Sequence, residues 1–156
     1  MVKRAFQVQA LHGKKVARVI AKNAHVSLKY STELLREIKG IRVDRAERFL
    51  NNILEEKEFL PLRKYKKKVG HRKGASKSFT KSGRYPKRLA KVFLKALEEL
   101  KSNADYKGLD AENLLIVHGF ASQGYARISF QSQGRISGKR RKRKATHLEL
   151  IAREAS

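Results

Sequence analysis

The sequence predicts an α+β fold: a three-stranded antiparallel sheet with three helices packed on one face and a long β-hairpin extension. Three segments place apolar residues at helical spacing, and near the C-terminus two apolar, strand-like runs enclose a long basic stretch. A chain of 156 residues suits one domain with one hydrophobic core. We therefore expect residues 1–156 to form a single domain.

The hairpin is predicted for residues 114–153, with its tip near residues 129–137. The apolar run 114–117 and the alternating run 147–151 are its flanking strands, and the stretch between them is too long for a tight turn. Apolar residues in that stretch are spaced mostly two apart, which favours two antiparallel arms of about 12 residues, each reaching roughly 40 Å at ~3.3 Å per residue. An isolated two-stranded ribbon is marginally stable in water, so the arms require a partner.

The residues before the first predicted helix are interpreted as an arm followed by a strand. Residues 1–23 are basic and weakly patterned, so we expect an arm with one helical turn. Residues 24–30 alternate, with Val26, Leu28 and Tyr30 on one side, which is typical of a half-buried strand. They are the expected third strand of the sheet.

Two short helices are predicted next. Ser31 or Thr32 can cap the first helix, and Gly40 is well placed to end it in a left-handed conformation. The second helix has an apolar stripe over residues 43–54. Pro61 is expected to mark its exit, because proline disfavours helical geometry in the residue before it.

The third helix gives the clearest helical signal. Pro86 suits its first position, and the helix is expected to end near residues 102–104. Its apolar residues recur at the spacing of one helix face, and they are Leu89, Val92, Phe93, Ala96, Leu97 and Leu100. Asp110 is expected to cap a short turn before the hairpin begins.

The positive charge is unevenly distributed along the chain. The protein has 38 Lys and Arg residues against 14 Asp and Glu, a formal net charge of +24. Residues 59–97 and 113–148 contain 22 of these bases and no acid, which leaves 16 bases against all 14 acids in the remainder. A nearly neutral body that carries two polycationic surfaces is typical of nucleic-acid-binding proteins.

One polycationic surface is a basic insertion loop at residues 62–85. This segment has no apolar period, so we expect it to be disordered in the free protein and ordered when phosphates neutralise it. A solvated linker is the alternative, but linkers rarely carry charge of one sign only. The other surface is the hairpin, whose glycines permit close approach of another backbone and whose aromatic residues can stack on bases.

Several classes of chemistry find no support in the sequence. Without cysteine there are no disulfides and no cysteine-based zinc sites. The five histidines are scattered, so we expect no metal and no cofactor, and no acid–base or nucleophile constellation points to an enzyme. The acids lie on predicted helix faces and ends, where surface ion pairing explains them. No apolar run approaches the ~18 residues of a membrane span, so we expect a cytoplasmic protein with no membrane partner.

A set of motifs in order resembles a known family. The motifs are residues 31–40 with the following helix at Val43, Ala46 and Leu50, then Gly83-Arg84-Tyr85-Pro86, then the run from Ser102 to Asp110, then Gly134-Arg135-Ile136 followed by Thr146-His147-Leu148-Glu149-Leu150. Over residues 24–154 the chain resembles the large-subunit ribosomal protein twenty-two family. Its basic insertion and short C-terminus resemble the archaeal branch of that family.

The resemblance implies a structural constituent of the large ribosomal subunit, with no catalytic activity and no cofactor. The expected partners are several domains of large-subunit rRNA, neighbouring ribosomal proteins, and the nascent polypeptide in the exit tunnel, which the hairpin would line. Two alternatives stay open. One is a free-standing basic protein that compacts DNA or chaperones RNA, and the other is a nucleic-acid enzyme.

The expected site residues come from the basic segments and from the resemblance. The expected rRNA-binding residues are Arg63, Lys64, Lys66, Lys67, Lys68, His71, Arg72, Lys73, Lys77, Lys81, Arg84, Tyr85, Lys87, Arg88, Arg127, Arg135, Lys139, Arg140, Arg141, Lys142, Arg143 and Lys144. The expected tunnel-lining tip residues are Ser129, Phe130, Gln131, Ser132, Gln133, Gly134, Arg135 and Ile136. Arg127 and Arg135 are the charges expected nearest the nascent chain or the tunnel rRNA.

Overall fold

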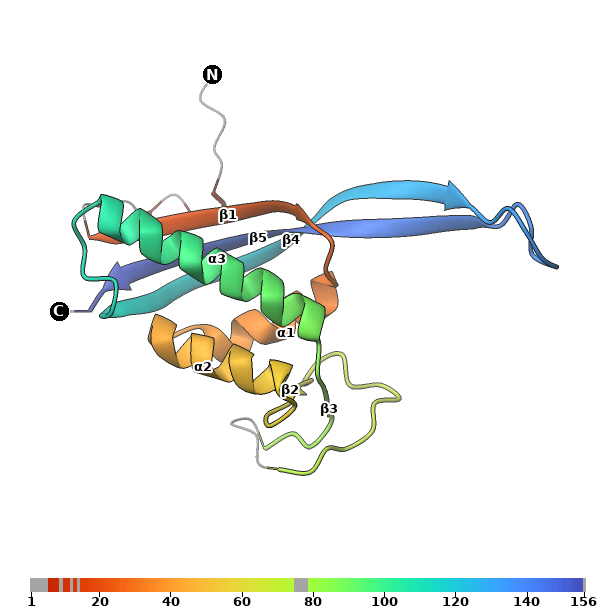
Figure 1. Ribbon diagram of the computed structural model, residues 1–156, viewed down its shortest axis with the longest axis horizontal. Coiled ribbons are helices and arrows are strands. Elements are labelled where there is room, and N and C mark those ends of the chain that lie inside the picture. The colour runs from red at the N-terminus through yellow and green to blue at the C-terminus, as the bar shows by residue number, and fades with distance from the viewer. Residues whose placement is uncertain (1–5, 9, 12, 14, 75–78, 156) are drawn as a thin grey trace, which may run out of the picture.

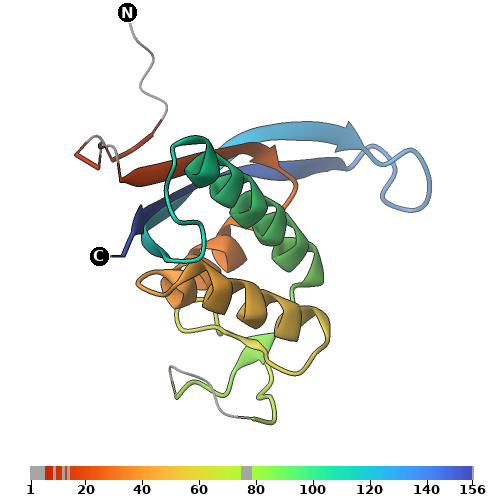
Figure 2. The same cartoon turned by 60° about the vertical axis from the view of Figure 1, so that its left-hand side comes forward.

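The computed structural model describes residues 6–8, 10, 11, 13, 15–74 and 79–155, and it has the predicted α+β architecture (Figure 1). In chain order the elements are β1 (Val16–Ala24), α1 (Leu28–Ile38), α2 (Val43–Leu54), β2 (Leu60–Pro61), β3 (Gly83–Arg84), α3 (Lys87–Tyr106), β4 (Leu114–Phe130) and β5 (Arg140–Glu154). The larger sheet is antiparallel with the order β1-β5-β4, and β2 pairs with β3 separately. The three helices cover one face of the larger sheet (Figure 2).

The central strand of the larger sheet is β5, and its partners change along its length. From Thr146 to Arg153 it pairs with β1 on one side and with β4 on the other. From Arg140 to Lys144 it pairs with β4 alone. This outer part of the hairpin, residues 125–144, is named the hairpin arm, and it projects beyond β1 and the helices (Figure 1).

The core fills the space between the helices and the sheet. Phe93 of α3, Leu34 of α1 and Leu50 of α2 are fully buried, and they belong to one cluster with Ile116 of β4 and Leu150 of β5. α3 packs on β1, α1 packs on β4, and α2 packs on α3. Removal of this apolar surface from water is the main source of stability for the body of the protein.

The expected position of the third strand is wrong. It is formed by Val16–Ala24, so residues 25–30 are not a strand and the N-terminal region is not merely an arm with a helical turn. The core-facing positions of β1 include Ala17, Val19 and Ala21. Alanine is weakly apolar and a poor strand former, so the alternation is hard to see in the sequence. These small side chains allow α3 to pack on the strand.

Residues 24–30 lead into α1 instead. Ser27 has an extended backbone and occupies the N-cap position, so the helix begins at Leu28. Ser31 and Thr32, which were expected to cap the helix, lie inside its first turns. Their hydroxyl groups donate hydrogen bonds to the backbone carbonyls of Ser27 and Leu28 at 2.8 and 2.9 Å.

The ends of the first two helices follow from backbone conformation. Gly40 follows α1 with a φ of +78°, which confirms the predicted left-handed conformation. α2 ends at Leu54, earlier than expected, and Glu56 in a left-handed conformation with a φ of +61° turns the chain away. Pro61 therefore does not mark the exit of the helix, because it already belongs to β2.

The third helix is longer than expected. Pro86 is its N-cap rather than its first helical residue, and the helix continues to Tyr106. Ala104 is fully buried, so the apolar face continues into the last turn of the helix, where the helix was expected to end. The prediction for Asp110 is confirmed, since its carboxylate accepts the backbone N–H of Glu112 at 3.0 Å in the turn before β4.

The disorder expected for residues 62–85 does not extend to the two ends of this segment. Leu62 is fully buried at its start, and Ser82 is buried near its end. The backbone N–H of Leu62 donates to the carbonyl of Ser82 at 2.9 Å, next to the pairing of β2 with β3. The basic insertion loop therefore leaves and rejoins the body at one fixed point.

Two buried carboxylates of α1 hold the start of this loop. Glu33 is 1% exposed and accepts the backbone N–H groups of Lys64 and Tyr65 at 2.7 and 3.0 Å. Glu37 is 5% exposed and forms an ion pair with Arg63 at 2.8 Å. The expectation that surface ion pairing explains the acids is wrong for these two residues.

A core substitution tests the assigned packing. Phe93→Ala should lower the free energy of unfolding by about 3–5 kcal/mol, because it leaves a cavity between α3 and the sheet. Phe79→Ala is the matched control, since the side chain of Phe79 is 97% exposed, and it should change stability by less than about 0.5 kcal/mol. Urea unfolding followed by circular dichroism measures both. Equal destabilisation by the two variants would contradict the assigned core.

A second substitution tests the anchor of the loop. Glu33→Gln should accelerate amide hydrogen exchange at Lys64 and Tyr65 roughly tenfold, because a neutral acceptor binds an N–H group more weakly than a carboxylate. Glu99→Gln changes an exposed carboxylate of α3 and should leave the exchange of both amides unchanged. If Glu33→Gln leaves exchange at these two amides at the wild-type rate, Glu33 does not hold the loop.

Candidate nucleic-acid interface

One face of the hairpin arm sets cations directly against each other. Arg127 lies opposite Arg143, and Ser129 lies opposite Arg141. Directly opposed residues of an antiparallel pair share a face, so the two guanidinium groups of the first pair are on one side. Like charges in this arrangement destabilise a ribbon. A polyanion placed along the arm would offset this repulsion.

The opposite face of the arm combines apolar and cationic residues. Ile128 lies opposite Lys142, and Phe130 lies opposite Arg140. Ile128 is 44% exposed and Phe130 is 69% exposed, although both are strongly apolar. Exposed apolar side chains next to cations suit contact with nucleic acid, whose bases stack on apolar groups and whose phosphates bind the cations.

The tip of the arm is a turn between Phe130 and Arg140. Of the expected tip residues, Ser129 and Phe130 are the last two residues of β4, and the others, which include Arg135, lie in this turn. Gln131 fixes the base of the turn by accepting a hydrogen bond from Arg141. Lys139 also lies in the turn. With Arg135 and Lys139 as its basic residues, the tip carries fewer charges than the adjoining strand residues 140–144.

The basic insertion loop presents its cations to solvent. Its described members of the expected site are exposed basic residues, namely Arg63, Lys64, Lys66, Lys67, Lys68, His71, Arg72, Lys73, Lys81 and Arg84. The guanidinium of Arg72 lies 5.5 Å from the ring centre of the half-buried Tyr85. Lys77 lies outside the described residues.

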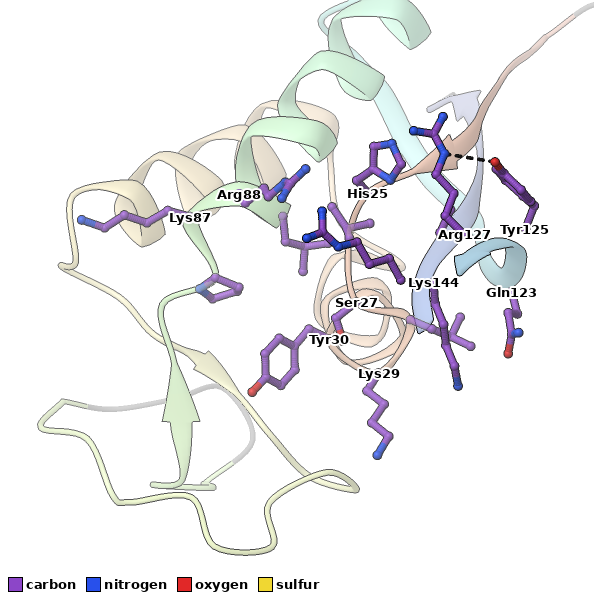
Figure 3. A pocket seen from close by; sticks show the side chains of 16 residues that line it. His25, Ser27, Lys29, Tyr30, Lys87, Arg88, Gln123, Tyr125, Arg127 and Lys144 are labelled. Carbon is purple, nitrogen blue, oxygen red and sulfur yellow. Dashed lines mark hydrogen bonds between the residues drawn. The ribbon is translucent and has the colours of Figure 1, made fainter. Parts of the chain in front are cut away.

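A groove at the root of the arm brings together residues from both basic segments (Figure 3). We name it the root groove, with a volume of about 910 Å³, and it is lined by residues 25–30, 86–89 and 143–145 together with Gln123, Tyr125 and Arg127. The expected site residues that it gathers are Lys87, Arg88, Arg127, Arg143 and Lys144. The tip and the rest of the hairpin arm, residues 128–142, do not line it.

Hydrogen bonds fix the shape of the groove at the hairpin root. Asn23, with a φ of +53°, donates its backbone N–H to Nδ1 of His147 at 3.1 Å. Its side-chain oxygen accepts the backbone N–H of Tyr125 at 3.2 Å. The buried hydroxyl of Thr146 donates to the carbonyl of Val26 at 2.9 Å. These bonds connect the end of β1 and the residues that follow it to both strands of the hairpin.

Among the residues that the structure describes, no carboxylate lines the root groove. Lys87 forms an ion pair with Glu56, outside the groove, at 2.7 Å, and the hydrogen bond and charge of Lys87 lower the pKa of Glu56. Arg127 donates from Nε to the hydroxyl of Tyr125 at 3.0 Å. Within the described ranges no ion pair is formed by Arg88 or Arg143.

Among the groove residues that are absent from the sequence-based prediction are His25, Lys29 and Tyr30. They were assigned to a strand, and their place at the start of a helix was therefore not seen. The signal that could have found them is Ser27, a good N-cap, followed by apolar residues at helical spacing from Leu28 onward.

The histidines show no metal-binding arrangement in the part of the chain that the structure describes, where no group of three His, Asp or Glu could hold an ion. Burial lowers the pKa of His118, and the positive charge of Lys39 adds to this effect. This shift favours the neutral form of His118, whose buried Nε2 atom has no hydrogen-bond partner among the residues that the structure describes. None of the described helices is long and apolar enough to cross a membrane.

Comparison with known proteins confirms the resemblance seen in the sequence. The model of the family described as ribosomal protein L22p/L17e matches residues 19–153. The large ribosomal subunit protein uL22 of Archaeoglobus fulgidus is 39% identical over 140 residues, which cover 88% of each chain. The uL22 proteins of Sulfurisphaera tokodaii and Sulfolobus acidocaldarius are 38% and 35% identical, over 90% and 99% of each chain. These relatives are named as ribosomal proteins and not as enzymes, and this chain belongs to the ribosomal protein L22p/L17e family.

Proposed function

We propose that the protein is a structural constituent of the large ribosomal subunit that binds large-subunit rRNA, supports its assembly and lines the polypeptide exit tunnel. The observation that carries this proposal is the hairpin arm, in which Arg127 opposes Arg143 on a two-stranded ribbon with no acid of its own. Such a ribbon gains stability from a phosphate-rich partner along its length. In a member of a ribosomal protein family, rRNA is that partner.

The basic insertion loop supplies a second RNA contact in this proposal. It leaves the body on a different side from the hairpin arm (Figure 2). Glu33 and Glu37 fix the start of the loop, so its exposed cations meet RNA from a defined position. Two separated cationic surfaces on one body favour contact with more than one rRNA domain, which is how a small protein holds RNA segments together during assembly.

The tip has a different role from the rest of the arm. Among residues 131–139 the basic residues are Arg135 and Lys139, and the remainder are small, polar or apolar. A tip with few charges is suited to the tunnel wall beside the nascent polypeptide. The outer surface of the body is left for neighbouring ribosomal proteins.

Binding to rRNA should depend strongly on salt. Each neutralised phosphate contributes a slope of roughly −0.7 to −0.9 in log K against log salt, so about ten contacts give a slope of roughly −7 to −9. Titration of a large-subunit rRNA fragment with the full chain at several salt concentrations measures this slope. A slope near zero would contradict an electrostatic interface.

Changes to the basic residues of the arm and changes to the tip should have different effects on incorporation into the large subunit. Replacing all six basic residues from Lys139 to Lys144 with Gln should weaken incorporation into the large subunit, and the defect should grow with salt, because phosphate contacts are lost. Replacing residues 131–139 with an Asn-Gly turn should preserve incorporation, since a two-residue turn can join Phe130 to its opposed residue Arg140. Quantitative mass spectrometry of purified subunits measures the occupancy of both variants.

The shortened tip should still change the tunnel. Ribosomes that carry it should differ from wild type in stalling on arrest peptides and in sensitivity to macrolides that bind the tunnel. The six-Gln variant controls for a general loss of the protein. Unchanged stalling and drug response in fully occupied subunits would show that the tip does not line the tunnel, and loss of incorporation with a folded body would show that it is an anchor.

A further inference from the structure

The root groove has properties that the rest of the basic surface lacks. It is concave, and its volume of about 910 Å³ falls within the roughly 300–1,000 Å³ typical of sites for small ligands. The rest of the hairpin arm and the insertion loop, by contrast, extend away from the body (Figure 1). A concave site selects a ligand by its shape as well as by its charge.

The floor of the groove is apolar. Val26, Leu89 and Ala145 line it and are buried, with exposed fractions of 8%, 3% and 2%. Tyr30, half-buried, and Tyr125, 56% exposed, add two aromatic rings to the lining. A phosphate makes no favourable contact with an apolar surface, whereas the face of a nucleobase packs well on apolar and aromatic groups.

The rim of the groove is cationic and unneutralised. Arg127 and Arg143 are directly opposed residues of the two strands and both line the groove. Arg88 projects from the start of α3 (Figure 3). Within the described part of the chain, neither Arg88 nor Arg143 has a carboxylate partner. A phosphate that enters this rim would relieve the repulsion between the two opposed guanidinium groups.

The N-terminal ends of α1 and α3 add to the positive electrostatic potential of the groove. The first turns of α1 and α3 both line the groove, and neither contains an acid. Ser27 makes no side-chain hydrogen bond to the start of α1, and Pro86 has no side chain that could cap α3. Uncapped N–H groups at a helix start favour an anion, which reinforces the arginine rim.

We propose that the root groove binds a single unpaired nucleotide of RNA, with its phosphate on the arginine rim and its base on the apolar floor. The inference rests on the proposed rRNA binding and specifies the ligand of one site within it. In a duplex the base faces are covered by their neighbours in the stack, so a duplex would leave the floor without contacts. A nucleotide that leaves the stack presents both a base face and a phosphate.

Two RNA stems of identical sequence, one with a single-nucleotide bulge and one without it, test this proposal with the full-length protein. Fluorescence anisotropy at fixed salt measures the affinity for each stem. The wild-type protein should bind the bulged stem roughly tenfold more tightly, which is within the contribution of stacking one base. The ratio of the two affinities cancels the general electrostatic attraction to phosphates.

Two double variants show which residues cause the preference for the bulged stem. Arg127→Gln with Arg143→Gln removes the two opposed arginines of the rim, and Arg140→Gln with Lys142→Gln removes the same charge from the opposite face of the arm. The rim variant should lose the preference for the bulge, so that both stems bind equally. The matched control should bind both stems more weakly and keep the preference. Circular dichroism shows that both variants retain the folded body.

The outcomes separate this inference from the proposed function. Equal, salt-dependent binding of both stems by the wild-type protein would overturn the nucleotide site and leave RNA binding intact. Loss of the preference in both double variants alike would also overturn it, because the preference would then come from total charge. Binding of neither stem would overturn both proposals.

Discussion

The backbone pairing of β5 is the constraint on which the rest of the structure depends. Between Thr146 and Arg153 the strand is held on both sides, by β1 and by β4, and its inward side chains complete the core. Between Arg140 and Lys144 it keeps only β4 as a partner. One continuous strand therefore joins a body that is stabilised by apolar burial to an arm that is not.

The distribution of acids follows the same division. In the body, Lys101 of α3 lies 2.8 Å from both Asp44 and Glu47 of α2, and the two carboxylates raise its pKa although partial burial opposes this. Glu33 and Glu37 hold the start of the insertion loop. The arm has no carboxylate, so its cations are left for a partner outside the chain. The acids thus make their contacts within the body, and the excess positive charge is left on the hairpin arm and the insertion loop.

Much of the fold follows from periodicity in the sequence. Phe93 and Leu97 recur at helical spacing, and the run 114–117 reads as a strand, so α3 and the hairpin could be predicted. β1 could not, because Ala17 and Ala21 give almost no apolar signal, although they face the core. Strand identity there depends on the packing of α3, which no local pattern reveals.

The site was predicted in part for a similar reason. Runs of cations such as Lys139 to Lys144 are visible in the sequence, whereas the root groove forms only when the first turns of α1 and α3 meet the hairpin. Glu33 looks like a surface acid until its partners, the backbone N–H groups of Lys64 and Tyr65, are known. Contacts between segments far apart in the chain cannot be read from either segment alone.

We propose that the body is stable alone and that RNA orders the hairpin arm. Amide hydrogen exchange along β5 tests it most directly, because one strand contains both regions. In the free protein, residues 148–152 should be protected and residues 140–144 should exchange rapidly; with bound rRNA both should be protected, and high salt should remove protection from residues 140–144 only. Equal protection of both regions in the free protein would contradict this account.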